Sequence, residues 1–120
     1  MKLIIDFLGD NKVKEILEFI KDKSIDLSEM GVNNFALSKS DALELLEKFK
    51  KNSILLYGGD FIEKKDGKIN YNYTNWSTDG KDIMYNLKYA ENFIQKYAKE
   101  YMYITFVTEI DLYRDYFTRA

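Results

Sequence analysis

Apolar residues recur every three or four positions in three stretches of the chain, the spacing of one buried helix face. We expect the first helix to be capped by Asp10 and to end near Lys23. The second begins at Ser38, where an acid three residues later completes a capping box. The third, expected to be the longest, opens between Asp79 and Asp82. The apolar positions are Val13, Ile16, Leu17 and Ile20; Ala42, Leu45, Leu46 and Phe49; and Ile83, Leu87, Ala90, Ile94 and Tyr97 or Ala98, with the third helix ending near Lys99.

Three longer stretches are typical of strands. Residues 54–57 are apolar without a period, as in a strand covered on both faces, so 54–62 is the best candidate for the centre of the sheet. The pair Asp66-Gly67 predicts a tight hairpin turn. After it, residues 68–75 alternate, and 76–80 are expected to turn. Ile69, Tyr71, Tyr73 and Asn75 share one face of this strand, and Lys68, Asn70, Asn72 and Thr74 the other; in the last strand, 101–107, Met102, Ile104 and Phe106 are the buried positions.

These elements predict an α+β fold in a single domain spanning residues 1–120. Residues 24–34 are interpreted as a loop, and 35–37 as a short strand before the second helix. The order helix, short strand, helix, hairpin, helix, strand predicts a sheet of three to four mostly antiparallel strands. About three helices pack on one side of it. Residues 111–117 are expected to add at most a turn of helix.

Composition narrows the range of possible chemistry. The chain is 46% hydrophobic and 32% charged, and no apolar run approaches the ~18 residues that span a bilayer. No secretory signal is recognisable at Met1, so cytoplasmic residence is the expectation. The absence of cysteine excludes disulfides, thiol nucleophiles and cysteine zinc sites. The absence of histidine removes the usual general acid or base and the commonest transition-metal ligand.

The charge balance argues against nucleic acid as a partner. Eighteen basic and twenty acidic residues give a net charge of −2, so there is no basic excess to attract phosphate backbones. Only two of the basic residues are arginines, Arg114 and Arg119, which leaves little capacity for bidentate phosphate recognition. We expect no membrane contact and no cofactor.

The tripeptide Gly58-Gly59-Asp60 interrupts the first long strand. Adjacent glycines cost conformational entropy and pack no side chain, so they usually indicate a bulge, a bend or a close backbone approach. Asp60 has two interpretations. It either accepts hydrogen bonds from turn amides or binds a partner, or else it acts as a catalytic base or a metal ligand. The first interpretation is favoured, because the sequence shows no partner base and no cluster of acids at metal-ligand spacing. Asp79 and Asp82 are explained better by helix capping than by calcium binding.

The aromatic residues of the second long strand have two interpretations. Tyr71, Tyr73 and Trp76 resemble a base-stacking platform, but the basic neighbours of such a platform are missing. Core packing is expected for at least two of the three. Any that remain exposed, edged by acids and amides, suit a protein partner, since tyrosine and tryptophan dominate binding energy at protein interfaces.

One family resemblance rests on these same residues. The run 54–61, which contains Gly58-Gly59-Asp60, is followed by Asn75-Trp76, a helix and a last hydrophobic strand, and it is preceded by 33–37 and another helix. Over roughly residues 30–108 this pattern resembles the bacterial polymorphic-toxin immunity family called immunity protein 40. Ser77 and Thr78 depart from the aromatic and acidic positions of that pattern.

The resemblance implies a small cytoplasmic protein, a monomer or weak homodimer, that binds and neutralises a cognate toxin without catalysis. Its partner-binding residues would be Asp60, Tyr71, Tyr73, Trp76, Asp79 and Asp82, with Gly58 and Gly59 shaping the motif. If the toxin is a nuclease, Asp60, Asp79, Asp82, Asp111 and Asp115 could mimic phosphates and accelerate association.

Two other interpretations stay open. The first is a different non-enzymatic interaction module, such as an accessory subunit of a phage or mobile-element system. The second is an enzyme working through Asp, Glu, Lys or Tyr. It would need a deep pocket holding a lysine and at least two of four acids, namely Asp60, Glu63, Asp79 and Asp82.

Overall fold

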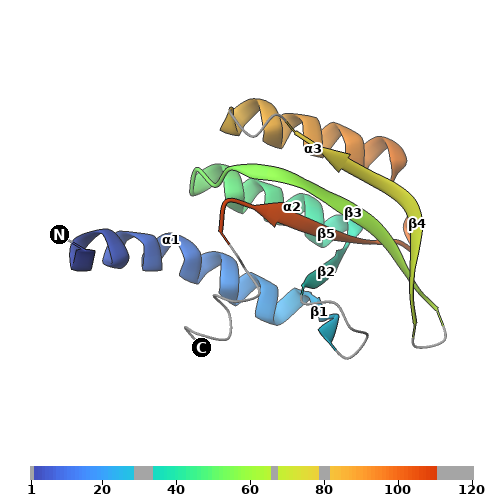
Figure 1. Cartoon of the computed structure of the whole chain (residues 1–120), viewed down its shortest axis with the longest axis horizontal. Helices are drawn as coiled ribbons and strands as arrows, with labels where there is room; N and C mark the ends of the chain where they lie inside the picture. The colour runs from blue at the N-terminus through green and yellow to red at the C-terminus, as the bar shows by residue number, and fades with distance from the viewer. Residues whose placement is uncertain (1, 29–33, 66–67, 79–81, 111–120) are drawn as a thin grey trace.

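The computed structural model describes residues 2–28, 34–65, 68–78 and 82–110, with the side chains of 13–28, 34–63, 75–78 and 82–110. It confirms the α+β class (Figure 1). The elements are α1 (Lys2–Lys23), β1 (Ile25–Asp26), β2 (Phe35–Ser38), α2 (Lys39–Lys51), β3 (Leu56–Lys65), β4 (Lys68–Ser77), α3 (Ile83–Tyr97) and β5 (Tyr103–Thr108). The predicted order of elements is therefore correct, with β1 as an addition.

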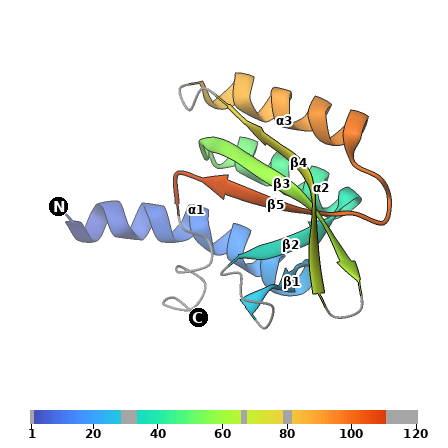
Figure 2. The same cartoon turned by 45° about the vertical axis from the view of Figure 1, so that its right-hand side comes forward.

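The strands form one five-stranded antiparallel sheet in the order β1-β2-β5-β3-β4. The prediction of three to four strands was one short, because β1 has only two residues and leaves no alternation to read. Figure 2 shows β5 running between β2 and β3, although β5 is the last of the described strands along the chain. The prediction that 54–62 forms the centre was wrong: β5 is central, and β3 lies beside it.

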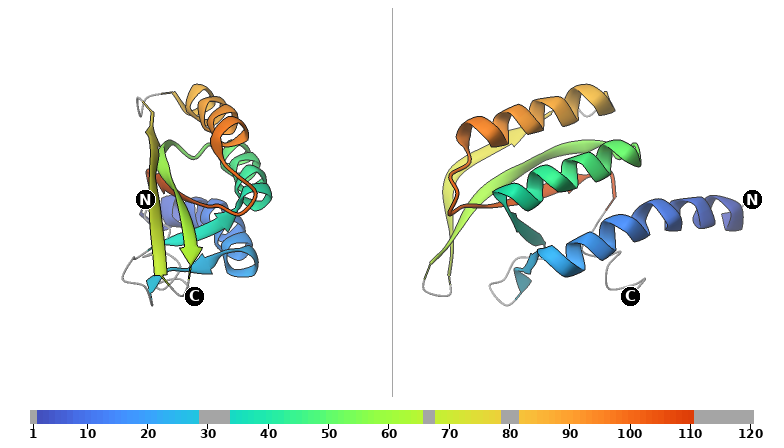
Figure 3. Two further views of the ribbon diagram at one scale, coloured as in Figure 1. Left: turned by 90° about the vertical axis from the view of Figure 1, so that its right-hand side faces the viewer. Right: turned by 180° about the vertical axis from the view of Figure 1, so that it is seen from behind.

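One face of the sheet is covered by helices, as predicted. Helices α2 and α3 lie side by side over it, and α1 packs beside α2 (Figure 3). The apolar run before the glycines is consequently not a strand buried on both faces. Ile54 and Leu55 precede β3, Leu56 points into the core, and Tyr57 is 42% exposed.

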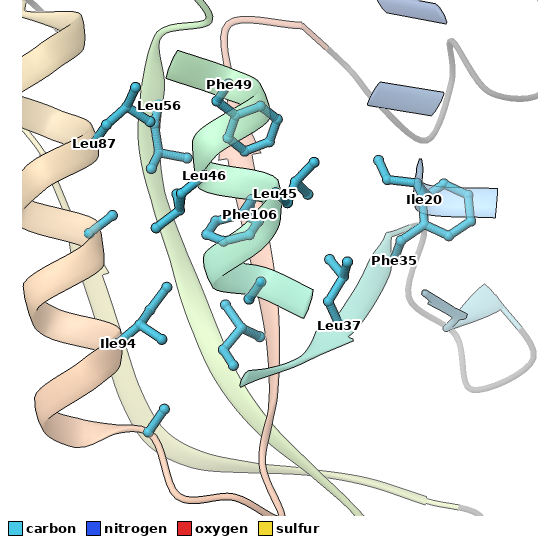
Figure 4. Packing of buried hydrophobic residues seen from close by; sticks show 14 of the residues in the cluster. Ile20, Phe35, Leu37, Leu45, Leu46, Phe49, Leu56, Leu87, Ile94 and Phe106 are labelled. Atoms are coloured by element: carbon cyan, nitrogen blue, oxygen red, sulfur yellow. The ribbon is translucent and has the colours of Figure 1, made fainter. Parts of the chain in front are cut away.

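Helix α2 carries the centre of the core. Ser38 caps it: the N–H of Asp41 donates to Ser38 Oγ over 3.3 Å, and Ser38 Oγ donates to Asp41 Oδ2 over 3.0 Å. The capping box is therefore confirmed. Figure 4 shows Leu46 pointing from α2 towards the α3 side and Leu45 towards α1. All four predicted inner positions of α2 are buried, as are Met102, Ile104 and Phe106 of the last strand.

Three predictions about the helices and the first loop were wrong. Asp10 lies inside α1 rather than at its cap, because Gly9 costs a helix only about 1 kcal/mol and does not stop it. At 22 residues α1, not the 15-residue α3, is the longest described helix. The segment 24–34 is not wholly a loop, since Ile25 and Asp26 pair with β2.

The hairpin of β3 and β4 was predicted correctly, but the residue at which β4 ends was not. Lys65 pairs with Lys68, so the connection has two residues, Asp66 and Gly67, which lie outside the described residues. Strand β4 continues through Trp76 and Ser77, which were expected to turn. At this end of β4, Trp76 is the buried residue and Asn75 is exposed. The predicted turn of helix at 111–117 lies outside the described residues.

None of the described helices is long and apolar enough to cross a membrane.

Candidate functional site

Gly58 and Gly59 bring three backbones close together. A Cβ on Gly58 would overlap the carbonyl oxygen of Trp76 in β4, and a Cβ on Gly59 would overlap that of Thr105 in β5. Such overlaps force the backbone to shift, so any larger residue would push β3 away from a neighbouring strand. The glycines therefore permit a close backbone approach within the sheet.

A β-bulge precedes the glycines. Between β3 and β5 the register passes from Leu56 opposite Thr108 to Gly58 opposite Val107, which leaves Tyr57 as the extra residue. Thr78, the residue after β4, bonds to the carbonyl groups of Leu56 and Tyr57 at this bulge. Thr78 Oγ1 donates to the oxygen of Leu56 over 2.6 Å, and Thr78 N–H donates to that of Tyr57 over 2.8 Å.

Helix α3 is joined to the same point. The side chain of Asn86, which is fully buried, donates from Nδ2 to the carbonyl oxygen of Leu56 over 3.2 Å. One carbonyl thus accepts from both Thr78 and Asn86, which fixes the end of β4 and the first turns of α3 against the bulge.

Asp60 lies on the sheet face opposite the helices. Its neighbour Phe61 points into the core, so strand alternation directs Asp60 to the other side, between its register partners Thr105 and Asn75. The Asp60 N–H donates to Thr105 Oγ1 over 3.3 Å. No described cation pairs with its carboxylate. Partial burial raises the pKa of Asp60, because desolvation disfavours the charged form.

Asp82 lies in a groove between the end of β4 and the start of α3. The groove has a volume of about 420 Å³ and is lined by Ser77, Thr78, Asp82, Tyr85 and Tyr89. Asp82 caps α3, with Oδ1 accepting the N–H of Tyr85 over 2.9 Å. Asp82 forms no ion pair with any residue in the described part of the chain. Ser77 shares a face of β4 with Asn75, the register partner of Asp60.

Four rings follow the groove along α3. We call Tyr85, Tyr89, Phe93 and Tyr97 the aromatic row; they recur at four-residue spacing and so share one side of the helix. Tyr89 stacks on Phe93 with centroids 6.1 Å apart, and Phe93 is 4.7 Å from Tyr97. The three tyrosines are exposed, Tyr85 by 61%, while Phe93 is half-buried against Trp76 and Phe61.

The predicted partner-binding residues fall into three groups. Asp60 and Asp82 lie on the surface, in the two places described above. Trp76 is 6% exposed, with its ring against Phe93 and Phe106, so it belongs to the core. The side chains of Tyr71 and Tyr73, and the whole of Asp79, lie outside those that the structure describes, although the backbone register pairs Tyr71 with Ile62.

The tyrosines at the groove were not among the predicted partner-binding residues. Tyr85 and Tyr89 flank the apolar stripe of α3 at four-residue spacing, and this was the signal that could have found them. Chemically, the groove offers one carboxylate, two phenols and two hydroxyl groups. Of the acids named for an enzyme pocket it contains Asp82, and among the described residues no three acids gather where they could hold a metal ion. The carboxylate, phenol and hydroxyl groups of the groove are therefore suited to binding a polar or charged group.

Comparison with known protein families identifies a match for most of the chain. Residues 26–108 match the family described as Immunity protein 40. The matched segment contains the glycines, Asp60, the groove and the aromatic row, whereas α1 precedes it. Neither the curated proteins nor the solved structures gave a match.

Proposed function

Because the chain belongs to the immunity protein 40 family, we propose that it binds a cognate bacterial toxin domain and neutralises it by direct protein contact, without catalysis. The match over residues 26–108 carries this proposal. The protein acts in the cytoplasm of the cell that it protects, as a monomer or weak homodimer.

The described surface supports a protein partner. Exposed tyrosines on one side of α3 provide large, rigid contact area, and tyrosine is enriched where protein interfaces concentrate their binding energy. Asp60, on the sheet face away from the helices, and Asp82, in the groove, add negative charge that no described cation neutralises. We assign toxin binding to these acids and to the aromatic row, and Trp76 supports the row from beneath through Phe93.

The negative charge of this surface favours a toxin with a basic binding site. A toxin that cleaves nucleic acid has a basic cleft, and unpaired carboxylates complement such a cleft and accelerate association. Asp60 and Asp82 are the described carboxylates that we place in this role. Association should therefore slow as ionic strength rises.

A co-expression assay tests the function. The chain is produced together with the C-terminal domain of the toxin encoded beside its gene, and growth is scored. We expect growth where the toxin domain alone prevents it, and co-elution of the two proteins on size exclusion. An inactive toxin domain controls for the burden of expression. Growth arrest in cells that contain the folded chain would refute the proposal.

A further inference from the structure

We infer that the groove lined by Ser77, Thr78, Asp82, Tyr85 and Tyr89 receives an arginine side chain of the toxin, with its guanidinium group between the Asp82 carboxylate and the tyrosine rings. This inference rests on the proposed toxin-binding function and identifies the contact that would anchor it.

Two residues of the groove are held by hydrogen bonds within the chain. Thr78 is held through the bulge at Leu56 and Tyr57, and Asp82 is held by its hydrogen bond to the Tyr85 N–H. The groove's volume of about 420 Å³ lies within the ~300–1,000 Å³ of pockets that enclose small ligands. Thr78 and Asp82, already held in this way, lose little further freedom when a side chain enters the groove, which favours affinity.

The charge of the groove calls for a cation. Oδ1 of Asp82 is used by the helix cap, while Oδ2 accepts no hydrogen bond from the described residues. No described lysine neutralises it: on the same helix, Lys88 pairs with Glu91 over 3.4 Å instead. A basic group from a partner would complete the pairing.

The lining favours arginine over lysine. A guanidinium group is planar, presents five donors and stacks on aromatic faces, whereas an ammonium group is a compact, strongly hydrated charge. Tyr85 and Tyr89 line the groove with aromatic rings suited to cation–π contact, one face of Tyr89 being stacked on Phe93, and Ser77 lines it with a hydroxyl oxygen that can accept. An acid beside two phenols thus matches the fork of an arginine.

The groove also lies where an anchor is useful. It opens at the first turns of α3, and the aromatic row continues from it through Phe93 to Tyr97. Interfaces typically concentrate their energy in a few buried arginine or aromatic residues, surrounded by contacts that exclude water. The row would supply those surrounding contacts.

The test separates charge from capping. Asparagine caps helices as well as aspartate does, so Asp82→Asn removes the charge while keeping the cap. We expect the Kd for the toxin domain to rise about tenfold, the equivalent of about 1.4 kcal/mol, with an unchanged melting temperature. Tyr89→Leu, which keeps apolar area and loses the aromatic face, should weaken binding several-fold. Tyr101→Leu is the matched control, because Tyr101 is 65% exposed outside the groove, and it should bind as the wild type does.

A scan of the toxin identifies the other half of the pair. Each arginine and lysine of the toxin domain is changed to alanine, and its Kd is measured with wild-type chain and with Asp82→Asn. One arginine whose loss costs nothing further in the Asp82→Asn background supports the inference. If the wild type binds the toxin and Asp82→Asn binds it equally well, the inference is wrong and the proposed function stands. The same holds if no arginine of the toxin shows this coupling to Asp82. If wild type does not bind at all, both are wrong.

Discussion

Gly59 of β3 lies against the indole ring of Trp76 in β4. The two residues are register partners, and a Cβ on Gly59 would lie 2.9 Å from Cζ2 of Trp76. The ring in turn packs against Phe93 of α3 and Phe106 of β5, with centroids 6.1 and 6.2 Å away. A missing side chain in the sheet thus creates the space in which the ring that supports the aromatic row is buried.

Gly59→Ala should therefore destabilise the fold. The new methyl group would overlap the carbonyl oxygen of Thr105 and press on Trp76, and overpacking of this kind costs about 1–3 kcal/mol. Denaturant unfolding followed by the emission of Trp76, the chain's single tryptophan, measures the loss. Ser77→Ala is the control on the same strand; Ser77 is exposed, and its change should stay within about 0.5 kcal/mol. Equal unfolding midpoints for Gly59→Ala and wild type would contradict this account.

Thr78→Val should loosen the joint between the bulge and α3. Valine keeps the shape but loses the hydroxyl that donates to the oxygen of Leu56, at a cost of about 1 kcal/mol. Thr78→Ser, which retains the donor, should recover most of that loss. Because Asn86 shares the acceptor, a double-mutant cycle with Asn86→Ala should be non-additive. Additive effects on the free energy of unfolding would show that the two donors act independently.

Asp60→Asn should raise stability at neutral pH while weakening toxin binding. The folded-state pKa of Asp60 lies above its ordinary value of 3.8, so folding favours the protonated form. The wild type therefore loses stability as pH rises through the folded-state pKa, and the neutral variant does not. Melting temperatures should favour the variant at pH 7 and converge below the unfolded-state pKa. A lower melting temperature for Asp60→Asn at pH 7 would mean that the charge makes a favourable contact.

Glu15→Gln should show the opposite pH dependence. A hydrogen bond from Asn52 Nδ2, at 3.2 Å, and then contacts with Lys51 and Lys48 at 3.3 and 3.6 Å hold the pKa of Glu15 below 4.5. This stabilisation is present above the unfolded-state pKa and is lost as pH falls through the folded-state pKa. The variant should melt below wild type at pH 7 and match it in acid. A difference that persists at low pH would mean that the amide disturbs the packing of α1 on α2.

Local patterns predicted most of the helices and strands. The apolar positions of α2 and the capping box at Ser38 depend on residues close in sequence, and the structure confirms them. The hairpin was predicted for the same reason, since the Asp-Gly pair lies in sequence directly between its two strands.

Tertiary contacts decided what the pattern could not predict. Trp76 looked like a turn residue beside Ser77 and Thr78, and only the space above Gly59 makes it a core residue of β4. Likewise the groove needs the bulge at Tyr57, which depends on β5, a strand far along the chain. Of the predicted partner-binding residues, Asp82 lines the groove and Asp60 lies on the other sheet face, while toxin binding by either stays a prediction.

The central place of β5 bears on when this protein begins to work. Strand β2 contacts β5, and β5 contacts β3, so the sheet is complete only after residues 103–108 have been inserted between segments synthesised much earlier. Pairings between distant segments form slowly, because a long loop must close first. A nascent chain still attached to the ribosome before Tyr103 emerges would hold an unjoined β3–β4 hairpin with no central strand. Any surface that depends on the complete sheet should thus form only after residues 103–108 have left the ribosome and paired with β2 and β3.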